Sequence, residues 1–267
     1  MPTPDVWAAA TLYEPYIGRW SRIVAQQFVP WLDIDPGALW IDVGCGTGAL
    51  TETILQLAAP KRVEGVDYSP DYVGYARARI VDRRVDFNVA DARSLPQENA
   101  SADAAVSGLS LNFVPEPIAT LREMLRVVRP ATGVVAAYVW DYADRMDLIR
   151  YFWNAAIELD PGAGPLDEGV RFPICNAPAL ADLFASAGLH EVDVRALDAA
   201  TYFRDFDDYW SPFLGGQGPA PGYTMSLSDE QRLRLRDHIR SVLPVRKDGS
   251  IDLIARAWAV RGRCAPA

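Results

Sequence analysis

The sequence predicts an α/β fold with seven strands in a mostly parallel sheet, and three observations support this prediction. Short apolar runs alternate with segments of helical periodicity over residues 37–142, as in parallel strands joined by right-handed crossover helices. The glycine-rich turn DVGCGTG at residues 42–48 stands between the first apolar run and the first helical segment. Two long stretches near the C-terminus have the pattern of strands that pair antiparallel at a sheet edge. We therefore expect a sheet flanked by helices, with its last strand antiparallel.

Each element of this fold has its own signal in the sequence. Apolar side chains recur every three or four positions over residues 12–31, which predicts N-terminal helices. Apolar runs that end at turn residues predict strands at 38–43, 62–69, 85–92, 102–114 and 133–142. Helical spacing predicts crossover helices at 49–58, 70–81 and 117–128. Beyond them we expect helices at 147–159 and 178–188, and the two long strands at 190–203 and 249–260.

The chain length sets the domain organisation that we expect. A chain of 267 residues is long enough for one large α/β domain and short for two domains with a linker. In this single domain, residues 1–36 would form N-terminal cap helices, 37–142 the core, and 143–267 lid insertions and C-terminal strands. The Gly- and Pro-rich segments 160–178 and 211–226 break the regular alternation. Irregular insertions of this kind are often lids or binding loops.

Charge and cysteine content narrow the range of partners. The formal net charge is −9, from 26 Lys and Arg against 35 Asp and Glu, so a phosphate backbone would be repelled and a nucleic-acid partner is disfavoured. Cys45, Cys175 and Cys264 lie far apart and contain no CxxC pair. We therefore expect neither disulfides nor a metal site, and we favour a cytoplasmic location. No run of eighteen apolar residues occurs, so we expect no membrane segment.

Three motifs that suit a nucleotide follow the first three predicted strands. Gly44, Gly46 and Gly48 allow a tight turn in which backbone amides approach a ligand closely. Asp67 ends the second strand, where a carboxylate can accept both hydroxyls of a ribose. Asp91 ends the third strand, where an adenine edge would lie. Because parallel strands end at one edge of a sheet, we expect these groups to converge on one nucleoside.

The spacing of the glycines argues against a nicotinamide dinucleotide. The motif reads GxGxG, whereas the dinucleotide fingerprint is GxGxxG, whose third glycine serves helix packing beside a pyrophosphate. The chain has only two lysines, Lys61 and Lys247, and neither stands in a YxxxK pair. A nicotinamide-dependent oxidoreductase is therefore disfavoured.

Longer runs of the sequence resemble a known family. The segments IDVGCGTG and VEGVDYSP, followed by DARSLPQENASADAAVSGLSLNFVPEPIATLREMLRVVRPATG, look like the class I S-adenosylmethionine-dependent methyltransferases, in particular their ubiquinone/menaquinone-biosynthesis-like small-molecule group. The resemblance covers about residues 37–140. It implies a Rossmann-like fold whose core at 37–142 binds S-adenosylmethionine as the cofactor. It also implies transfer of a methyl group to an O, N or C atom of a small-molecule acceptor.

The resemblance further implies roles for individual residues. The glycine turn would approach the methionine and ribose portions of the cofactor, with Asp42 near its amino group. Asp67 would hold the ribose hydroxyls, Tyr68 would lie on one face of the adenine, and Asp91 would accept from its exocyclic amine. Tyr13 or Arg19 would bind the methionyl carboxylate. The full set of predicted cofactor-binding residues is Tyr13, Arg19, Asp42, Gly44, Cys45, Gly46, Gly48, Asp67, Tyr68, Asp91, Ala92, Gly108 and Leu109.

The acceptor side of the site has a weaker signal. Residues after the fourth and fifth strands and in the insertions are its candidates, and many are aromatic, which suits a flat or apolar acceptor. The predicted substrate-pocket residues are Asn112, Phe113, Trp140, Arg171 and Trp210, with Tyr142, Trp153, Phe172 and Phe213 as further candidates. Asn112 stands where members of the family often have histidine, which leaves the acceptor chemistry open.

We assign no catalytic base from the sequence. His190 and His238 are the only histidines and are expected to be structural, and Asp141 reads as an ordinary loop residue. Positioning of the acceptor can contribute roughly 7–11 kcal/mol, whereas a general base contributes about 3–5 kcal/mol. Geometry therefore outweighs any single base in methyl transfer.

Two other functions stay open at this point. A methyltransferase of peptide or protein side chains would need a wide exposed groove near residues 160–225. A protein of this fold that binds the cofactor without methyl transfer would also carry the same motifs. For the chain itself we expect a monomer or a homodimer.

Overall fold

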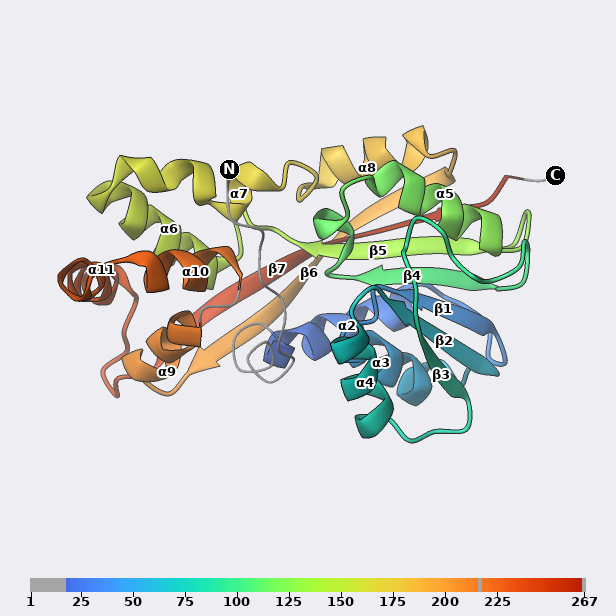
Figure 1. Cartoon of the computed structure of the whole chain (residues 1–267), viewed down its shortest axis with the longest axis horizontal. Helices are drawn as coiled ribbons and strands as arrows, with labels where there is room; N and C mark the ends of the chain where they lie inside the picture. Colours follow the sequence, from blue (N-terminus) through green and yellow to red (C-terminus); the bar gives the residue numbers. More distant parts are fainter. Residues whose placement is uncertain (1–17, 216–217, 266–267) are drawn as a thin grey trace. The chain divides into compact units, whose positions relative to one another are not determined.

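The sheet has the number of strands and the strand directions that the sequence predicts, but the fourth strand ends at Gly108 and not at the predicted residue 114. The computed structural model describes residues 18–215 and 218–265 of the chain. Seven strands form one sheet in the order β3-β2-β1-β4-β5-β7-β6 (Figure 1). Their bounds are β1 Leu39–Val43, β2 Arg62–Asp67, β3 Val85–Val89, β4 Ala104–Gly108, β5 Val134–Trp140, β6 His190–Phe203 and β7 Ile251–Arg263. Strands β1 to β5 pair in parallel, and β7 pairs antiparallel with β5. The predicted Rossmann-like α/β fold with an antiparallel last strand is confirmed.

Burial explains why the central strands are continuous apolar runs. Every residue of β5, which reads VVAAYVW, is buried. Strand β4 is buried at its first four residues. A strand covered by helices on both faces has no solvent-facing side, so it does not alternate apolar and polar residues. The edge strand β3 differs, because only Phe87 among its five residues is buried.

The helices predicted at 49–58, 70–81, 117–128, 147–159 and 178–188 are each present to within two residues at either end, and the predicted N-terminal helix is described from Arg19 onward. The helix bounds are α2 Arg19–Trp31, α3 Ala49–Leu57, α4 Pro70–Arg79, α5 Pro117–Val127, α6 Asp147–Leu159, α7 Glu168–Arg171, α8 Ala177–Ser186, α9 Phe206–Trp210, α10 Pro219–Ser226 and α11 Asp229–Val242. Ser69 begins α4 by accepting from the Tyr72 amide, with Pro70 at the first helical position. None of the helices in the described ranges is both long and apolar enough to span a membrane.

The Gly- and Pro-rich insertions are more regular than predicted. They contain the 3₁₀ helices η3 Pro161–Leu166 and η4 Ser211–Gly215 as well as α7 and α10. The Asp160 carboxylate accepts from the Gly162 amide, and Asp167 accepts in the same way from Gly169. These side chains cap helical turns, and proline at the first helical position fits the required φ. The expectation of irregular loops was therefore wrong, whereas a lid role for these segments stays a prediction.

The chain divides into two compact units. The unit that we call the sheet unit contains Ser21–Trp140, Ile174–Leu197 and the chain from Ala257 onward. The second, the helical unit, contains Asp141–Pro173 and Asp198–Arg256 together with residues 18–20. The long strands β6 and β7 each contribute residues to both units. That the two units act as a single domain stays a prediction.

Candidate functional site

The glycine turn after β1 lies in backbone conformations that favour glycine. Gly44, Gly46 and Gly48 have φ of +73°, +52° and +86°. A Cβ on Gly44 would lie 2.2 Å from Ser110 Oγ, and one on Gly48 would lie 2.5 Å from Ile80 Cδ1. Around Gly46, by contrast, a Cβ would meet nothing within 4 Å. Packing thus excludes a side chain at Gly44, whereas at Gly48 the close atom is the flexible end of Ile80 and the positive φ is what favours glycine. The middle glycine leaves its backbone open to a ligand.

Hydrogen bonds connect this turn to the end of β2. The Gly44 and Cys45 amides donate to the Val66 carbonyl at 2.8 and 2.9 Å. The Gly46 amide donates to Asp67 Oδ2 at 2.9 Å, and the Ser69 amide donates to Asp67 Oδ1 at 2.9 Å. Burial raises the pKa of Asp67, and the two amide hydrogen bonds oppose that increase. The Asp67 carboxylate is therefore fixed beside the open Gly46, with each oxygen able to accept a further hydrogen bond.

A second carboxylate, Asp42, is completely buried at the end of β1. The Thr51 hydroxyl donates to Asp42 Oδ2 at 2.6 Å. Its other oxygen, Oδ1, is buried and has no hydrogen-bond partner among residues 18–215 and 218–265. Burial raises the pKa of Asp42 to about 7; the Thr51 hydrogen bond lowers it and the neighbouring Asp67 raises it further. An unpaired buried oxygen next to another carboxylate is suited to a cation or a hydrogen-bond donor.

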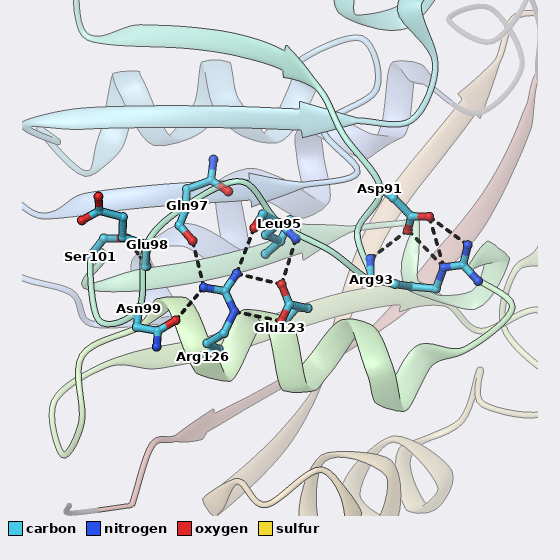
Figure 2. A network of polar contacts seen from close by, with 9 residues as sticks. All are labelled: Asp91, Arg93, Leu95, Gln97, Glu98, Asn99, Ser101, Glu123 and Arg126. Carbon is cyan, nitrogen blue, oxygen red and sulfur yellow. Dashed lines mark hydrogen bonds and ion pairs between the residues drawn. The ribbon is translucent and has the colours of Figure 1, made fainter.

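The loop after β3 brings Asp91 to the same edge of the sheet. The Ala90 amide donates to the Asp67 carbonyl at 3.0 Å, which places the end of β3 beside the end of β2. The Asp91 carboxylate pairs with Arg93, whose Nη2 lies 2.8 Å from Oδ2 (Figure 2). The hydrogen bonds from Arg93 lower the pKa of Asp91 to about 2. The three predicted groups thus converge, but an arginine that the sequence analysis did not consider already pairs with one of them.

Arg126 fixes the rest of this loop to α5. Its guanidinium donates to both Glu123 oxygens at 2.8 and 2.7 Å, and to the carbonyls of Leu95 and Gln97, each at 2.9 Å (Figure 2). Glu123 in turn accepts from the Leu95 amide at 2.8 Å. Sequence reasoning missed this network, although the i,i+3 spacing of a glutamate and an arginine on a helix is a recognisable signal.

The end of β4 completes the edge. A Cβ on Gly108 would lie 2.6 Å from the Tyr138 hydroxyl oxygen, so the predicted glycine is required by packing. Leu109 has a φ of +59°, which is strained for a leucine, and its amide donates to the Tyr138 carbonyl at 2.8 Å. Ser110 Oγ donates to the Val43 carbonyl at 3.2 Å and lies 2.7 Å from Ser107 Oγ. Ser110 therefore joins the loop after β4 to the glycine turn.

Comparison with known proteins identifies the family of this arrangement. The family described as a methyltransferase domain matches residues 41–136, from β1 into β5. The chain carries a class I S-adenosylmethionine-dependent methyltransferase domain. S-adenosylmethionine is the cofactor of that family.

Relatives and solved structures agree with this assignment. A malonyl-acyl-carrier-protein O-methyltransferase of Hahella chejuensis is 36% identical over 97 residues, which are 36% of this chain and only 35% of that protein. A ubiquinone/menaquinone biosynthesis C-methyltransferase of Desulfotalea psychrophila is 27% identical over 187 residues, covering 66% of this chain and 74% of that protein. An Anabaena variabilis structure, provisionally assigned as a methyltransferase from an antibiotic biosynthesis pathway, has a TM-score of 0.63 at 16% identity and covers 90% of this chain and 98% of that one. The last of these supports the fold alone.

The structure gives different results for three further residues that were predicted to bind the cofactor. Tyr68 is 79% exposed directly after Asp67, so its ring is free to stack on a flat ligand. Cys45 is buried, its amide donates to Val66, and its side chain packs beside Val73, Ala76 and Phe87. We therefore give Cys45 a packing role and do not retain it as a ligand. Tyr13 lies outside the described residues.

Arg19 lies in the helical unit and is already engaged there. Its Nη1 is 3.4 Å from Asp208 Oδ1. Its guanidinium also lies over the rings of Trp20 and Phe203, at 4.4 and 4.8 Å from their centroids. Its binding to a methionyl carboxylate stays a prediction.

The predicted substrate-pocket residues are mostly packed. Trp140 is 2% exposed in β5 and Trp210 is 5% exposed in α9, so both rings belong mainly to cores. Arg171 lies over the ring of Phe172, 5.4 Å from its centroid. Asn112 keeps a buried Nδ2 without a hydrogen-bond partner in the part of the chain that the structure describes. Of these residues, only Asn112 therefore has the character expected of a polar pocket group.

Trp210 borders an open groove of about 490 Å³ within the helical unit. The groove is lined by Asp207, Trp210, Leu214, Asp229, Arg232, Leu233 and Arg236. The arginine-rich helix α11 forms one of its walls. His238, on the same helix, pairs with Glu158 at 2.6 Å, which is consistent with the structural role expected of it.

Proposed function

We propose that this protein is an S-adenosylmethionine-dependent methyltransferase that methylates an O, N or C atom of a small-molecule acceptor. The observation that carries the proposal is the convergence of Gly46, Asp67 and Asp91 at the carboxyl ends of three adjacent parallel strands. In open α/β sheets, ligands bind at this edge. The match of residues 41–136 to a methyltransferase domain supports the same conclusion.

The residues at this edge fit the cofactor group by group. The open space around Gly46 admits a ligand against the backbone, and the Asp67 carboxylate would accept the ribose hydroxyls. The unpaired Asp42 Oδ1 suits the amino group of the methionyl portion, which is cationic. Tyr68 would cover one face of the adenine, with Asp91 and the Ala92 amide at its edge. Gly108 and Leu109 would face the methionyl end. When bound, S-adenosylmethionine supplies an electrophilic methyl group on a sulfonium.

The contribution of the protein to catalysis is mainly positioning. The glycine turn is fixed by Val66, Asp67 and Ser110, so the edge of the sheet is preorganised before any ligand binds. Preorganised geometry can contribute roughly 7–11 kcal/mol, more than a general base supplies. We accordingly assign no catalytic base. Asn112, directly after β4, is the polar residue that we propose for orienting the acceptor.

Two observations favour a small-molecule acceptor over a nucleic acid. The net charge of −9 opposes binding to a phosphate backbone. The two relatives described above are named as an O-methyltransferase of malonyl-acyl-carrier protein and a C-methyltransferase of ubiquinone/menaquinone biosynthesis. Because they differ in the atom methylated, the acceptor atom of this chain is left as O, N or C. A cytoplasmic monomer or homodimer completes the proposal.

Binding of S-adenosylhomocysteine, measured by titration calorimetry, is the first test. We expect the wild-type chain to bind and Asp67→Ala to lose about 10- to 100-fold in affinity, because hydrogen bonds to a charged group are lost. Asp82→Ala removes a carboxylate from before β3 and is the matched control, with unchanged affinity. Absence of binding to the wild-type chain, or equal affinity in Asp67→Ala, would contradict the proposed site.

Methyl transfer itself needs a separate assay. Radiolabelled S-adenosylmethionine offered with a broad panel of phenols, amines, carboxylic acids and quinols should label at least one small product. If the chain binds the cofactor but labels only peptides, the acceptor class is wrong. If it labels nothing, a cofactor-binding protein without methyl transfer becomes the better description.

A further inference from the structure

The sequence Asp-x-Arg occurs on both sides of β3 with nearly the same local geometry. Before the strand, the Arg84 guanidinium donates to Asp82 Oδ1 at 3.0 Å and Oδ2 at 2.8 Å, and the Arg84 amide donates to Oδ1 at 2.9 Å. After the strand, Arg93 repeats this arrangement on Asp91, with its Nη2 2.8 Å from Oδ2 and its amide 2.9 Å from Oδ1. Only the second pair lies at the end of the sheet where Gly46 and Asp67 converge. The two pairs thus share their geometry and differ in location and in the further partner of the guanidinium, which is the Leu55 carbonyl for Arg84 and Glu116 for Arg93.

The pair after β3 leaves Asp91 little capacity for another donor. A carboxylate has about four lone-pair directions. Asp91 receives the Arg93 amide and Nε on Oδ1, at 2.9 and 3.1 Å, and Nε and Nη2 on Oδ2, at 3.3 and 2.8 Å (Figure 2). A ligand amine that needs this carboxylate must therefore displace the guanidinium, at least in part.

Glu116 helps to hold the Arg93 guanidinium against the Asp91 carboxylate. Glu116 Oε1 accepts from Arg93 Nη1 at 3.0 Å, directly before α5. The Arg93 side chain is 39% exposed, and both carboxylates are also partly exposed, at 35% for Asp91 and 66% for Glu116. Solvent screens an ion pair that is this exposed, so although the bidentate geometry and Glu116 strengthen it, the guanidinium can leave Asp91 at a modest cost. Arg93 therefore has a position on Asp91 and an accessible alternative in solvent.

We propose that Arg93 sets the affinity and base selectivity of the nucleoside site by competing with the ligand for Asp91. The inference rests on the proposed function, because it takes Asp91 as the acceptor for the exocyclic amine of the adenine. With Arg93 on Asp91, the edge presents guanidinium donors in place of free carboxylate acceptors. A base with a carbonyl oxygen at the same ring position would then accept a hydrogen bond from the Arg93 guanidinium, whereas the adenine amine would compete with that guanidinium for Asp91.

Removal of Arg93 should increase affinity, contrary to the usual effect of removing an arginine from a ligand site. By calorimetry, Arg93→Ala should bind S-adenosylhomocysteine about two- to fivefold more tightly than the wild-type chain, as expected for loss of an exposed competing ion pair. Glu116→Gln should shift affinity in the same direction by less, and should add nothing to Arg93→Ala. Arg84→Ala removes the equivalent arginine before β3 and should leave affinity unchanged.

Selectivity gives a readout that a structural role of Arg93 would not change. S-inosylhomocysteine carries a carbonyl in place of the adenine amine, so it should bind more weakly to Arg93→Ala than to the wild-type chain. The preference for the adenosyl over the inosyl ligand should therefore increase in Arg93→Ala and stay constant in Arg84→Ala. Thermal unfolding of each variant establishes that the compared proteins are folded. Arg93→Lys keeps the charge with fewer donors, so its preference for the adenosyl ligand should lie between those of the wild-type chain and Arg93→Ala.

The possible outcomes separate this inference from the proposed function. If the wild-type chain fails to bind S-adenosylhomocysteine, both the inference and the proposed function are overturned. Wild-type binding with an unchanged or reduced affinity in Arg93→Ala overturns only the competition, and a reduced affinity would make Arg93 itself a ligand of the cofactor. An unchanged adenosyl-to-inosyl preference in Arg93→Ala overturns the selectivity part.

Discussion

The strand ends of the sheet unit and the aromatic residues of the helical unit are positioned by different interactions. At the strand ends of the sheet unit, backbone amides fix the Asp67 carboxylate, and Asp42 Oδ1 has no hydrogen-bond partner among residues 18–215 and 218–265. In the helical unit, the aromatic rings are packed against one another, as in the stacked pair Phe152 and Phe213 at 4.6 Å. The difference teaches that the residues proposed to bind the cofactor are fixed by backbone geometry, which a motif encodes, whereas the residues proposed for the acceptor depend on packing, which a motif does not encode.

The helical unit shows how strongly packing controls its side chains. The Tyr209 hydroxyl donates to the Leu148 carbonyl at 2.9 Å, and its ring lies 5.5 Å from that of Phe213. Trp153 Nε1 donates to the buried Glu168 carboxylate. Aromatic residues with a polar end are used here to satisfy buried groups. Their number in the sequence therefore reflects a core at least as much as a pocket.

The largest expected effect distinguishes a buried ring from an exposed one. Phe152→Ala should lower the free energy of unfolding by about 3–5 kcal/mol, because a fully buried ring of the helical unit is replaced by a cavity. Tyr68→Ala, at a side chain 79% exposed, should change stability by less than about 0.5 kcal/mol. Denaturant unfolding measures both.

The same two variants should also differ in their affinity for the ligand. If Tyr68 stacks on the adenine, Tyr68→Ala should weaken S-adenosylhomocysteine binding by about 5- to 100-fold, the range of base–aromatic stacking. A Tyr68→Ala variant that is unstable but binds normally would reverse the comparison between the two units. It would place Tyr68 in a core and remove it from the proposed site.

The next prediction, intermediate in size, concerns the pH dependence of stability that arises from two buried carboxyl groups, one in each unit. Burial raises the pKa of Glu168 from 4.5 to about 7 and that of Asp42 from 3.8 to about 7. Each group binds its proton more tightly in the folded state, so its stabilising contribution is full below the unfolded pKa and is lost as pH rises toward 7. Glu168→Gln should therefore be more stable than wild type by roughly 3 kcal/mol at pH 8, with the difference gone below about pH 4.

Asp42→Asn should change the pH profile of stability in the same direction as Glu168→Gln, but it should also affect ligand binding, which Glu168→Gln should not. Because Asp42 belongs to the proposed site, its variant should also lose affinity for S-adenosylhomocysteine. Unfolding curves from pH 4 to 8 and calorimetry at pH 8 give both readouts. Stability differences that grow toward acid pH would show that these carboxyls are ionised and paired in the folded chain.

The sequence was informative where a structural feature depends on neighbouring residues. Strands β1 to β5, their crossover helices and the glycine turn were predicted because apolar period and turn residues act within a few positions. Asp67 was placed because strand ends converge in a parallel sheet. The helical turns at 161–171 were missed because the Gly and Pro content was taken as a sign of irregular loops. There, Asp160 and Asp167 cap short helices.

Features that join distant parts of the chain were not predictable in the same way. The contact of Ser110 with Val43 spans 67 positions, and no local pattern marks it. Trp140 and Trp210 were assigned to a pocket on composition, but aromatic residues are equally suited to a core, and burial decides between the two. The pairing of Arg93 with Asp91 is local, yet it depends on a side-chain conformation that a motif does not specify.

The smallest expected effect concerns Ser110, which sequence reasoning missed. Ser110→Ala removes the hydrogen bond to the Val43 carbonyl and the contact with Ser107 Oγ, at a cost of about 1 kcal/mol in stability. Because Ser110 Oγ also occupies the space beside Gly44, the glycine turn loses a support, and affinity for S-adenosylhomocysteine should decrease by about two- to tenfold. Ser101→Ala, which removes only a contact with the Glu98 carbonyl on the loop before β4, is the matched control for a lost serine hydrogen bond. Equal affinities in the two variants would mean that the glycine turn holds its shape without Ser110, and that β2 alone, through Val66 and Asp67, is enough to fix the cofactor side of the site.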